Sequence, residues 1–343
     1  MQLNEGQQTA IAEIQHWLSG TDPYYFLSGQ AGTGKSFLAS VIRGYAMKEL
    51  HMGVHITATT NKAAAVLAEM MPSAETSTIY SLLGLRVVNN FSDGSQSISK
   101  QGKCTAEPGA LVLVDEASMV DPVLMDFLND AAFSLGLRVL FLGDAYQLPP
   151  VNAGTMPVVS PSIQASYLTE IMRANKREDL EEVYRMGREM VIEESGVFMP
   201  AASNNVTILQ KEGSKDYLAQ LLKEDPHAKI LGYTNQAVNS SNMLCRELLG
   251  LPDTPMPGDI LSAEDMVMVN GERLAYIGQE FEVESSTDTT FSLNGTHYPA
   301  QEITTTCGRV FARAQNPVDR TNCMKALANS KSWREYFLLK ETI

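Results

Sequence analysis

Apolar runs of strand length alternate with segments of helical periodicity in the first half of the chain. The runs lie at 23–28, 54–60, 110–114 and 137–144. Apolar side chains recur at helical spacing in the segment after the first run, and a helix-like, alanine-rich segment follows the second. Unbroken apolar runs are typical of parallel strands that are buried on both faces. The alternation therefore predicts an α/β fold with a doubly wound parallel sheet.

A polar segment at 86–107 interrupts this alternation. Within it, "VVNNFS" and "QSISKQ" flank Asp93–Gly94, a dipeptide that favours tight turns. The segment predicts a β-hairpin inserted into an N-terminal domain of residues 1–175, with Phe91 near the tip of the hairpin.

The pattern in the second half is weaker. The segment 229–250 reads as a strand, a turn and a helix, which would open a second domain within 176–265. Short alternating segments and an Asn270–Gly271 turn follow a loop rich in proline. They predict a small β-barrel or sheet in the region 266–343.

Composition adds few constraints. The chain has 343 residues, of which 44% are hydrophobic and 19% charged, as in ordinary globular proteins. No apolar run approaches the roughly 18 residues of a membrane span, and the N-terminus lacks the pattern of a signal peptide. The cysteines contain no CxxC pair, which favours reduced thiols in a cytoplasmic protein over a zinc site; they are Cys104, Cys245, Cys307 and Cys323.

The formal net charge of −14 argues against binding of duplex nucleic acid by bulk electrostatics. It does not exclude a narrow channel for a single strand. In such a channel, stacking and hydrogen bonds to the backbone supply much of the affinity.

A glycine-rich loop follows the first apolar run. The sequence "GQAGTGKS", residues 29–36, matches the pattern GxxxxGK[ST] between a predicted strand and a predicted helix. Glycines in this pattern let backbone N–H groups turn toward phosphates; here they are Gly29, Gly32 and Gly34, with Thr33 between the last two. Lys35 reaches the β and γ phosphates, and the Ser36 hydroxyl can bind Mg²⁺. The loop predicts a site for ATP.

Two carboxylates end the third apolar run, in "ALVLVDEAS". Ligands bind at the carboxyl ends of strands in open α/β sheets. Asp115 is predicted to hold Mg²⁺ through water, and Glu116 to orient and deprotonate the attacking water. The alternative is an acidic start of a helix, since carboxylates favour helix N-termini.

Eight segments in order resemble the motifs of superfamily 1 DNA helicases of the 5′→3′ branch, most closely the Dda-type phage helicases and their RecD-like relatives. They are "LNEGQ", "GQAGTGKS", "ITATTNKAA", "TSTIYSLLG", "VDEAS", "GDAYQLPPV", "LTEIMRAN" and "ILGYTNQAVNSSN". The glycine-rich loop alone indicates only a broad class, whereas the ordered string is specific. The resemblance implies a RecA-like P-loop NTPase domain, the start of a second RecA-like domain at 176–265 and an SH3-like β insertion within 266–343.

The resemblance also implies roles for single residues around the nucleotide. Gln7 would read the adenine edge, while Gln147 and Arg173 would reach the γ phosphate. Arg173 would act as an arginine finger, which stabilises charge in the phosphoryl-transfer transition state. The residues alone favour a turn residue before Pro149 and Pro150 for Gln147, and a solvated arginine near a helix start for Arg173.

A path for single-stranded DNA is predicted at the second strand end. Small hydroxyls and free N–H groups there suit phosphates, although the same threonines can cap the following helix. The residues assigned to this path are Thr57, Thr59, Thr60, Asn61 and Lys62, extended by Thr78, Ser81 and Leu82. Family members carry a duplex-splitting pin at the place of the hairpin. Phe91 would therefore cap the last base pair, or else form part of the hairpin core.

Two closing motifs of the family, of the HKSQG and TR types, do not occur in these 343 residues. The first couples DNA to the nucleotide, and the second supplies another arginine finger. The expectation is a truncated or interrupted product, or a chain that a second polypeptide completes. Because a missing arginine finger costs about 10³ to 10⁵ in turnover, we expect ATP binding with feeble hydrolysis and no processive unwinding.

Two function classes follow. The first is an ATP-dependent 5′→3′ DNA helicase, or its N-terminal portion, in phage-type replication, recombination or repair, with ATP as substrate and Mg²⁺ as cofactor. The alternative is a catalytically incomplete module that binds ATP and single strands and regulates or complements a separate polypeptide. The expected partners are single-stranded DNA and its junctions with duplex, and the expected state is a cytoplasmic monomer without a membrane contact.

Overall fold

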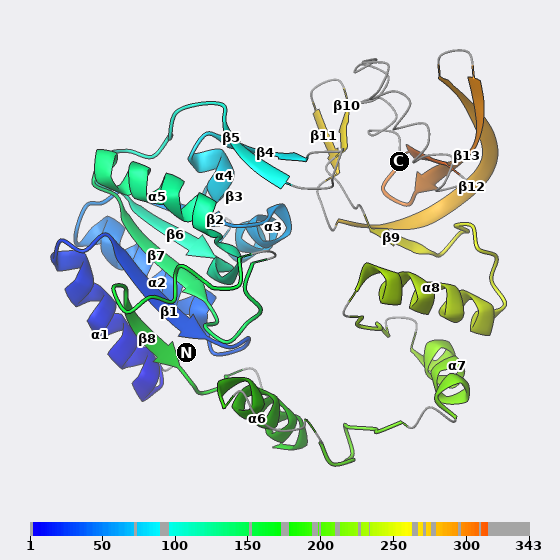
Figure 1. The fold of residues 1–343 in the computed structure, drawn as a ribbon, viewed down its shortest axis with the longest axis horizontal. Helices are drawn as coiled ribbons and strands as arrows, with labels where there is room; N and C mark the ends of the chain where they lie inside the picture. Colours follow the sequence, from blue (N-terminus) through cyan, green and yellow to red (C-terminus); the bar gives the residue numbers. More distant parts are fainter. Residues whose placement is uncertain are drawn as a thin grey trace. The chain divides into compact units, whose positions relative to one another are not determined.

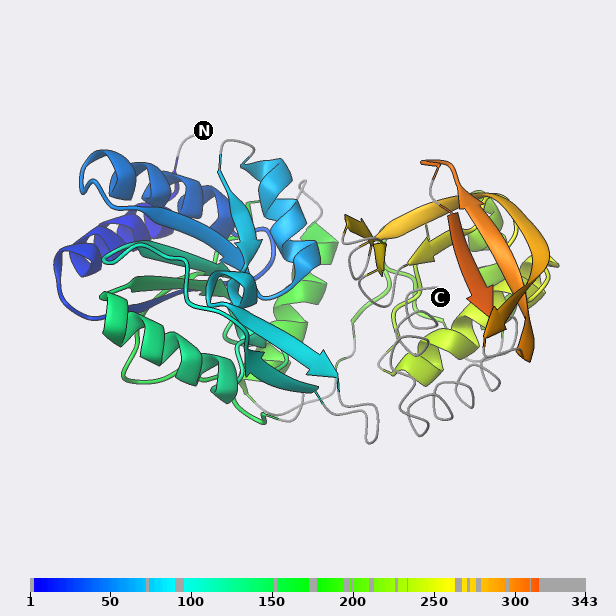
Figure 2. The ribbon, with the colours of Figure 1, turned by 90° about the horizontal axis from the view of Figure 1, so that it is seen from above.

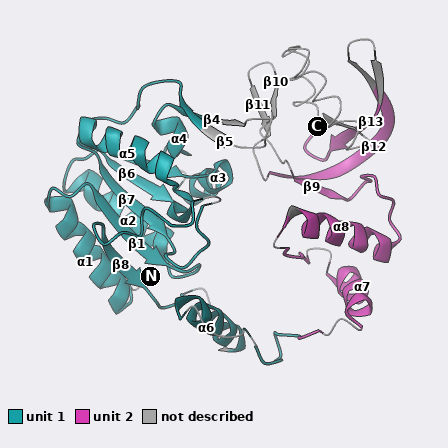
Figure 3. Cartoon of the chain, viewed as in Figure 1, with its two compact units in different colours: residues 1–207 teal, residues 208–343 magenta. Residues whose placement is uncertain are grey.

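The computed structural model divides into two compact units, Met1–Thr207 and Ile208–Ile343 (Figure 3). It describes residues 3–71, 74–89, 96–150, 153–172, 178–193, 198, 200–209, 213–225, 228–232, 234–262, 267–269, 272–275, 279–293, 296–308 and 310–314. Within these ranges, no helix has both the length and the apolar character that crossing a membrane requires.

A parallel sheet of six strands forms the centre of the first unit, in the order β3-β2-β6-β7-β1-β8 (Figure 1). The elements are α1 (Glu5–Ser19), β1 (Tyr24–Gly29), α2 (Lys35–Lys48), β2 (Val54–Ala58), α3 (Asn61–Met70), β3 (Thr76–Thr78), α4 (Ile79–Leu82), β4 (Leu85–Asn89), β5 (Gln96–Lys100), β6 (Leu111–Asp115), the 3₁₀ turn η1 (Ala117–Met119), α5 (Pro122–Leu135), β7 (Arg138–Gly143), β8 (Gln164–Leu168) and α6 (Glu178–Ile192). The predicted α/β fold of RecA-like type is confirmed.

Apolar cores on both faces of the sheet explain the unbroken apolar runs. In β6, Leu111 and Leu113 pack with α1, α2 and α3, whereas Val112 and Val114 pack with α4 and α5 on the opposite face. Successive side chains of a strand point to opposite faces, so a strand covered on both sides is apolar at every position.

The sheet brings four strand ends to one edge. Ala58 at the end of β2 pairs with Asp115 at the end of β6, and Ser28 of β1 pairs with Gly143 at the end of β7. In parallel strands the carboxyl ends share one edge, so the segments that follow these strands can form one site.

An antiparallel hairpin confirms the prediction for residues 86–107. Its strands β4 and β5 pair from Leu85 opposite Lys100 to Asn89 opposite Gln96. Figure 2 shows the two strands projecting from the body of the first unit. The backbone N–H groups of Gln101 and Gly102 both donate to the Gly84 carbonyl, at 2.8 and 2.9 Å. Phe91 lies outside the described residues, and its role stays a prediction.

Gly84, at the base of the hairpin, is expected not to tolerate a side chain. Its φ is +67°, and a Cβ there would lie 2.7 Å from the Gly102 carbonyl carbon and 2.8 Å from the Lys103 oxygen. We expect Gly84→Ala to lower the free energy of unfolding by about 2–5 kcal/mol, since backbone strain and overpacking both contribute. Urea unfolding of the full chain measures the change.

Gly136 provides the matched control, because its φ is +63° and nothing lies within 4 Å of the position of its Cβ. Gly136→Ala is expected to cost only the left-handed strain, about 1–2 kcal/mol. Equal losses in the two variants would show that the contacts at the base of the hairpin do not matter for stability.

The described part of the second unit contains two helices and a set of antiparallel strands. They are α7 (Ser214–Glu224), α8 (Asn235–Leu249), β9 (Ile260–Ser262), β10 (Val267–Val269), β11 (Glu272–Ala275), β12 (Glu280–Leu293), β13 (Thr296–Thr305) and β14 (Val310–Ala314). The last three form one sheet with β9, in the order β14-β13-β12-β9, and β10 pairs with β11. The short alternating segments after residue 265 are therefore strands, as predicted.

One prediction for this unit is wrong. The strand expected before α8 is absent, because the structure has no regular element at 228–232. A strand needs a neighbour for its backbone hydrogen bonds. Every strand in the described part of this unit lies between Ile260 and Ala314, and none pairs with residues 228–232. Leu231 accordingly is 94% exposed.

The helix α6 groups with the first unit, although the sequence analysis began a second domain at residue 176. Arg188 of α6 forms an ion pair with Asp144, which follows β7, at 3.3 Å. This contact places α6 beside the edge where the strand ends of the sheet meet.

Candidate active site

Glycine conformations shape the loop between β1 and α2, residues 29–36, which we call the P-loop. Gly32 and Gly34 have φ of +86° and +95°, in the left-handed region that side chains disfavour. A Cβ at Gly29 would lie 2.5 Å from Thr33 Oγ1. Gly34 is the N-cap of α2 and supplies no side-chain cap, so the first N–H groups of this helix are available to an anion.

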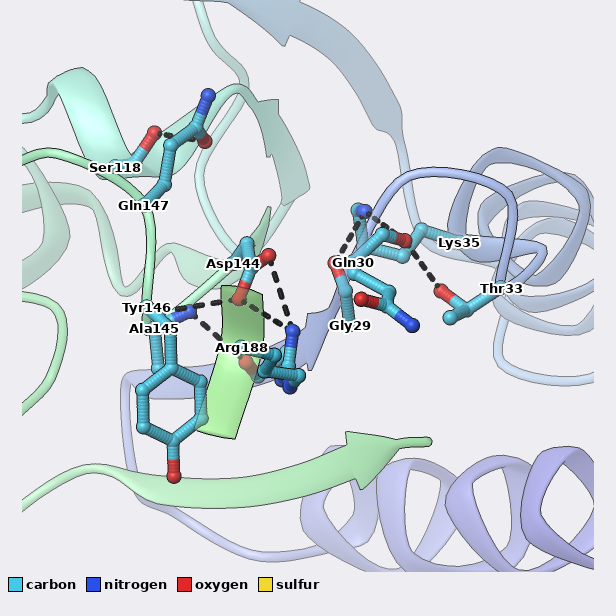
Figure 4. Close-up of polar contacts among 11 residues, drawn as sticks. Gly29, Gln30, Thr33, Lys35, Ser118, Asp144, Ala145, Tyr146, Gln147 and Arg188 are labelled. Carbon is cyan, nitrogen blue, oxygen red and sulfur yellow. Dashed lines mark hydrogen bonds and ion pairs between the residues drawn. The ribbon is translucent and has the colours of Figure 1, made fainter. Parts of the chain in front are cut away.

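Lys35 lies folded back across this loop (Figure 4). Its Nζ donates to the carbonyls of Gly29 and Gln30, at 2.5 and 3.2 Å. Burial lowers the pKa of Lys35, whereas the carboxylates of Asp115, Asp144 and Glu116 act to raise it. Phosphate oxygens form stronger, charge-assisted hydrogen bonds than neutral carbonyls do, so a bound polyphosphate can take over this ammonium group.

Two carboxylates stand at the end of β6. The Glu116 N–H donates to Asp115 Oδ1 at 2.9 Å. Burial raises the pKa of Asp115. The Glu116 side chain reaches solvent, yet the surrounding protein and the charge of Asp115 raise its pKa as well. Raised pKa values are typical of groups that accept or release protons in a reaction.

Glu116 also has an unusual backbone. Its φ is +53°, and among the described residues only one other non-glycine residue, His51, has a positive φ. Left-handed conformations cost about 1–2 kcal/mol for residues with a side chain. Such strain is concentrated at functional sites, which supports a role for Glu116.

The donor set at this edge fits a nucleotide bound with Mg²⁺. Ser36 lies in the first turn of α2, directly after Lys35, and Asp115 ends the strand β6. Hydroxyl and carboxylate oxygens are the ligands that Mg²⁺ prefers. The uncapped start of α2 and the Lys35 ammonium supply the donors that phosphates require.

Gln7 is buried against the P-loop, with 4% of its surface exposed. Its Nε2 donates to the Thr33 carbonyl at 3.1 Å, and its Oε1 accepts from Asn4 N at 3.3 Å. Asn4 and Gln7 together form the capping box of α1. Gln7 thus joins the start of α1 to the P-loop, and its contact with adenine stays a prediction.

Gln147 lies apart from Lys35, in a pair of its own (Figure 4). Its Oε1 accepts a hydrogen bond from Ser118 Oγ at 2.8 Å. Arg173 lies outside the described residues; the residue before it, Met172, donates its N–H to the Gly32 carbonyl of the P-loop at 2.8 Å. Both predicted roles stay predictions.

The predicted DNA-contacting residues differ in accessibility. Thr57 is 1% exposed, and its hydroxyl donates to the Leu113 carbonyl at 2.8 Å, so it belongs to the interior of the sheet. Thr59 is also buried and donates to the Glu116 carbonyl at 3.2 Å. Leu82 is in the apolar core. These three side chains do not form an open surface.

The remaining members lie closer to solvent. Thr60 caps α3 by accepting from Ala63 N at 3.1 Å, and Thr78 caps α4 by accepting from Ser81 N at 3.2 Å. The capping that the sequence suggested for the α3 threonines is therefore present at Thr60. Five of the predicted residues are exposed or half-exposed; they are Thr60, Asn61, Lys62, Thr78 and Ser81.

Sequence reasoning missed two charged residues at the same edge, Asp144 and Arg188. Asp144 accepts from Tyr146 N at 3.1 Å and from Arg188 Nη1 at 3.3 and 3.4 Å. The Arg188 guanidinium lies 4.6 Å from the centre of the Tyr146 ring. Asp144 could have been found as a carboxylate at a strand end. Arg188 could not, because Arg185 lies in the same charged helix and no local pattern distinguishes the two arginines.

Comparison with known proteins agrees with this geometry. The model of the AAA_30 family, an AAA domain, matches residues 2–198. The ATP-dependent RecD2 DNA helicase of Deinococcus radiodurans is 36% identical over 151 residues, which cover 43% of this chain and 19% of that helicase. The ATP-dependent DNA helicase dda of Enterobacteria phage T4 is 26% identical over 182 residues, which cover 50% of this chain and 40% of dda.

A solved structure of Pif1 helicase from Candida albicans aligns with 92% of this chain and 78% of its own, at 19% identity and a TM-score of 0.41. The resemblance to DNA helicases that the sequence motifs indicated is confirmed by the curated relatives, and the chain spans less than half of the length of RecD2 or dda. Because the family model covers more than half of the chain and contains the whole site described above, the protein belongs to the AAA_30 family of AAA domains.

Proposed function

We propose that this chain is an ATP-dependent 5′→3′ DNA helicase, or the portion of one that hydrolyses ATP. The observation that carries the proposal is the convergence of Lys35 with Asp115 and Glu116, whose charges act on one another at the edge of the sheet. The relatives RecD2 and dda, both named as ATP-dependent DNA helicases, support the same assignment.

The residues of the site divide the reaction among them. Lys35 and the N–H groups at the start of α2 hold the phosphates, and Ser36 with Asp115 would hold Mg²⁺. When bound, the ion neutralises charge that develops on the phosphate oxygens. Glu116 orients the attacking water and accepts its proton, a role for which its raised pKa is suited.

Backbone contacts join this site to the proposed DNA path. Thr59 donates its N–H to the Asp115 carbonyl at 3.3 Å and its hydroxyl to the Glu116 carbonyl at 3.2 Å. The next residues, Thr60, Asn61 and Lys62, reach solvent. A shift of the backbone at Asp115 and Glu116 during hydrolysis would therefore move the start of α3, where we place the phosphates of a single strand.

The finer assignments belong to the same proposal. We place the 176–265 region as the start of a second motor domain and the later strands as an SH3-like insertion. Single-stranded DNA and its junctions with duplex are the proposed partners. The proposed setting is phage-type replication, recombination or repair in the cytoplasm.

ATP turnover by the full chain, with and without an oligothymidine strand, tests the function. We expect binding of a fluorescent ATP analogue and a slow turnover that the strand accelerates. An unchanged rate would favour an ATP-binding module without coupling to DNA. Failure to bind nucleotide would contradict the proposal as a whole.

Lys62 tests the DNA path separately. We expect Lys62→Ala to weaken binding of oligothymidine and to reduce the slope of log affinity against log salt by about 0.7, since one phosphate contact is lost. Fluorescence anisotropy over a series of salt concentrations measures both quantities. Lys48→Ala, at the exposed end of α2, is the control and should change neither. Identical salt slopes in both variants would remove Lys62 from the path.

A further inference from the structure

Arg188 reaches the nucleotide site from outside the sheet. It lies on α6, and its partner Asp144 directly follows β7. The last residue of β7, Gly143, pairs with Ser28, which precedes the first residue of the P-loop, Gly29. Ala145 N also donates to Ser28 Oγ at 3.1 Å, so the segment after β7 is held against the end of β1. Arg188 is therefore placed beside the start of the P-loop.

The hold on Arg188 is weak for an ion pair of low exposure. The Arg188 side chain is 19% exposed, yet Nη1 meets the two Asp144 oxygens at 3.3 and 3.4 Å, longer than the usual 2.7–2.9 Å of charge-assisted bonds. Among the described residues, no acceptor faces its other guanidinium nitrogens. The group lies on the Tyr146 ring, 4.6 Å from its centre, which orients the plane without using an N–H.

The charges around the P-loop also include Arg188. Its positive charge acts to lower the pKa of Lys35, while the negative charge of Asp144 acts to raise this pKa, so both groups lie within electrostatic reach of the lysine ammonium. Figure 4 shows the Arg188 side chain joined to Asp144. Among the described residues, the charges that act on Lys35 are those of Asp115, Asp144, Glu116 and Arg188, and Arg188 uses only one of its guanidinium nitrogens in a hydrogen bond.

We propose that Arg188 is a second cation of the nucleotide site, which binds the terminal phosphate of ATP once the nucleotide fills the P-loop. A planar guanidinium with free N–H groups can bind two oxygens of a phosphate at once. The contact with Asp144 uses only one guanidinium nitrogen and leaves this capacity unused. Asp144 and Tyr146 keep the side chain at the edge until then. The inference rests on the proposed ATP site, and it concerns a different residue from Arg173, to which the helicase resemblance gives the role of arginine finger.

Binding of two nucleotides to the full chain tests this contact. For Arg188→Met we expect a loss of about 10- to 100-fold in affinity for a non-hydrolysable ATP analogue, the effect of one hydrogen bond to a charged group. The affinity for ADP, which lacks the terminal phosphate, should change less than about two-fold. Arg188→Lys should restore part of the loss, because it keeps the charge but not the fork.

Arg185→Met is the matched control. Arg185 lies on the same helix and, within the described ranges, forms its ion pairs with Glu182 and Glu189 at the surface. If Arg188→Met lost affinity for ADP and for the ATP analogue equally, the residue would only support the site. If it lost no affinity, the contact would be excluded. Either result would overturn the inference, while nucleotide binding by the wild-type chain would still uphold the ATP site. If the wild-type chain binds neither nucleotide, the proposed function fails first. Thermal unfolding of each variant separates these outcomes from misfolding.

Discussion

Glu116→Gln is expected to slow ATP turnover by about 10²–10⁴-fold while leaving nucleotide affinity nearly unchanged. The amide has the shape of the carboxylate but cannot accept the proton of the attacking water. Glu116 is suited to that step because burial, and then the charge of Asp115, raise its pKa above the ordinary 4.5. Single-turnover hydrolysis measures the rate, and titration with a fluorescent nucleotide measures the affinity.

The same pKa predicts how the rate depends on pH. Glu116 must be ionised to act as a base, so kcat/KM of the wild-type chain should rise as the pH increases through the raised pKa. This inflection should be missing from the residual rate of Glu116→Gln. A profile that is identical in both proteins would assign the inflection to another group.

The contribution of Glu116 to stability should fall as the pH rises, whereas its contribution to activity should increase. Because the folded-state pKa of Glu116 is raised, the folded protein binds this proton more tightly than the unfolded chain does. The corresponding stabilisation is present at low pH and is lost as the pH rises through the folded-state pKa. At neutral pH the charge is unfavourable, so Glu116→Gln should unfold at the same temperature or higher. Glu69→Gln, at an exposed position of α3, is the control.

Lys35→Met is expected to reduce turnover by about 10²–10³-fold or more, through weaker binding of the triphosphate and of the transition state. The Nζ atom donates to the carbonyls of both Gly29 and Gln30, at the place where phosphates are proposed to bind. Methionine keeps a similar unbranched shape without the charge. Nucleotide titration and turnover measurements at several ATP concentrations separate the two effects.

Lys48→Met is the control for this variant. Lys48 ends the same helix, α2, and is exposed at the far end from the P-loop. We expect it to change neither affinity nor turnover. Wild-type turnover in Lys35→Met would exclude the P-loop as the catalytic site, whatever else binds there.

Much of the fold could be predicted because short sequence patterns reflect how each strand is covered and how neighbouring strands are connected. An unbroken run such as 110–114 is apolar at every position because its strand is covered on both faces. The hairpin could be predicted because a turn dipeptide lies between two strand-like segments, which pair in the structure. The strand expected before α8 is absent at 228–232, because a strand depends on a neighbour that no local pattern reveals.

The site residues also differ in how far the sequence alone could predict them. Lys35, Asp115 and Glu116 are recognisable because glycine spacing and strand ends place them whatever the distant parts of the chain do. The surroundings of Thr57 and Gln147 were not predictable. Thr57 donates to the carbonyl of a neighbouring strand, and Gln147 accepts from Ser118, which is 29 residues away.

The sequence by itself determined the α/β sheet, the P-loop and the two carboxylates, because each depends on residues close together in the chain. Only the tertiary structure decided which threonines are buried, where Gln147 is held, and that Arg188 reaches Asp144 from 44 positions away. The physical reason is that electrostatics and burial depend on distance in space. A solvated arginine and one beside a phosphate site can have the same sequence context.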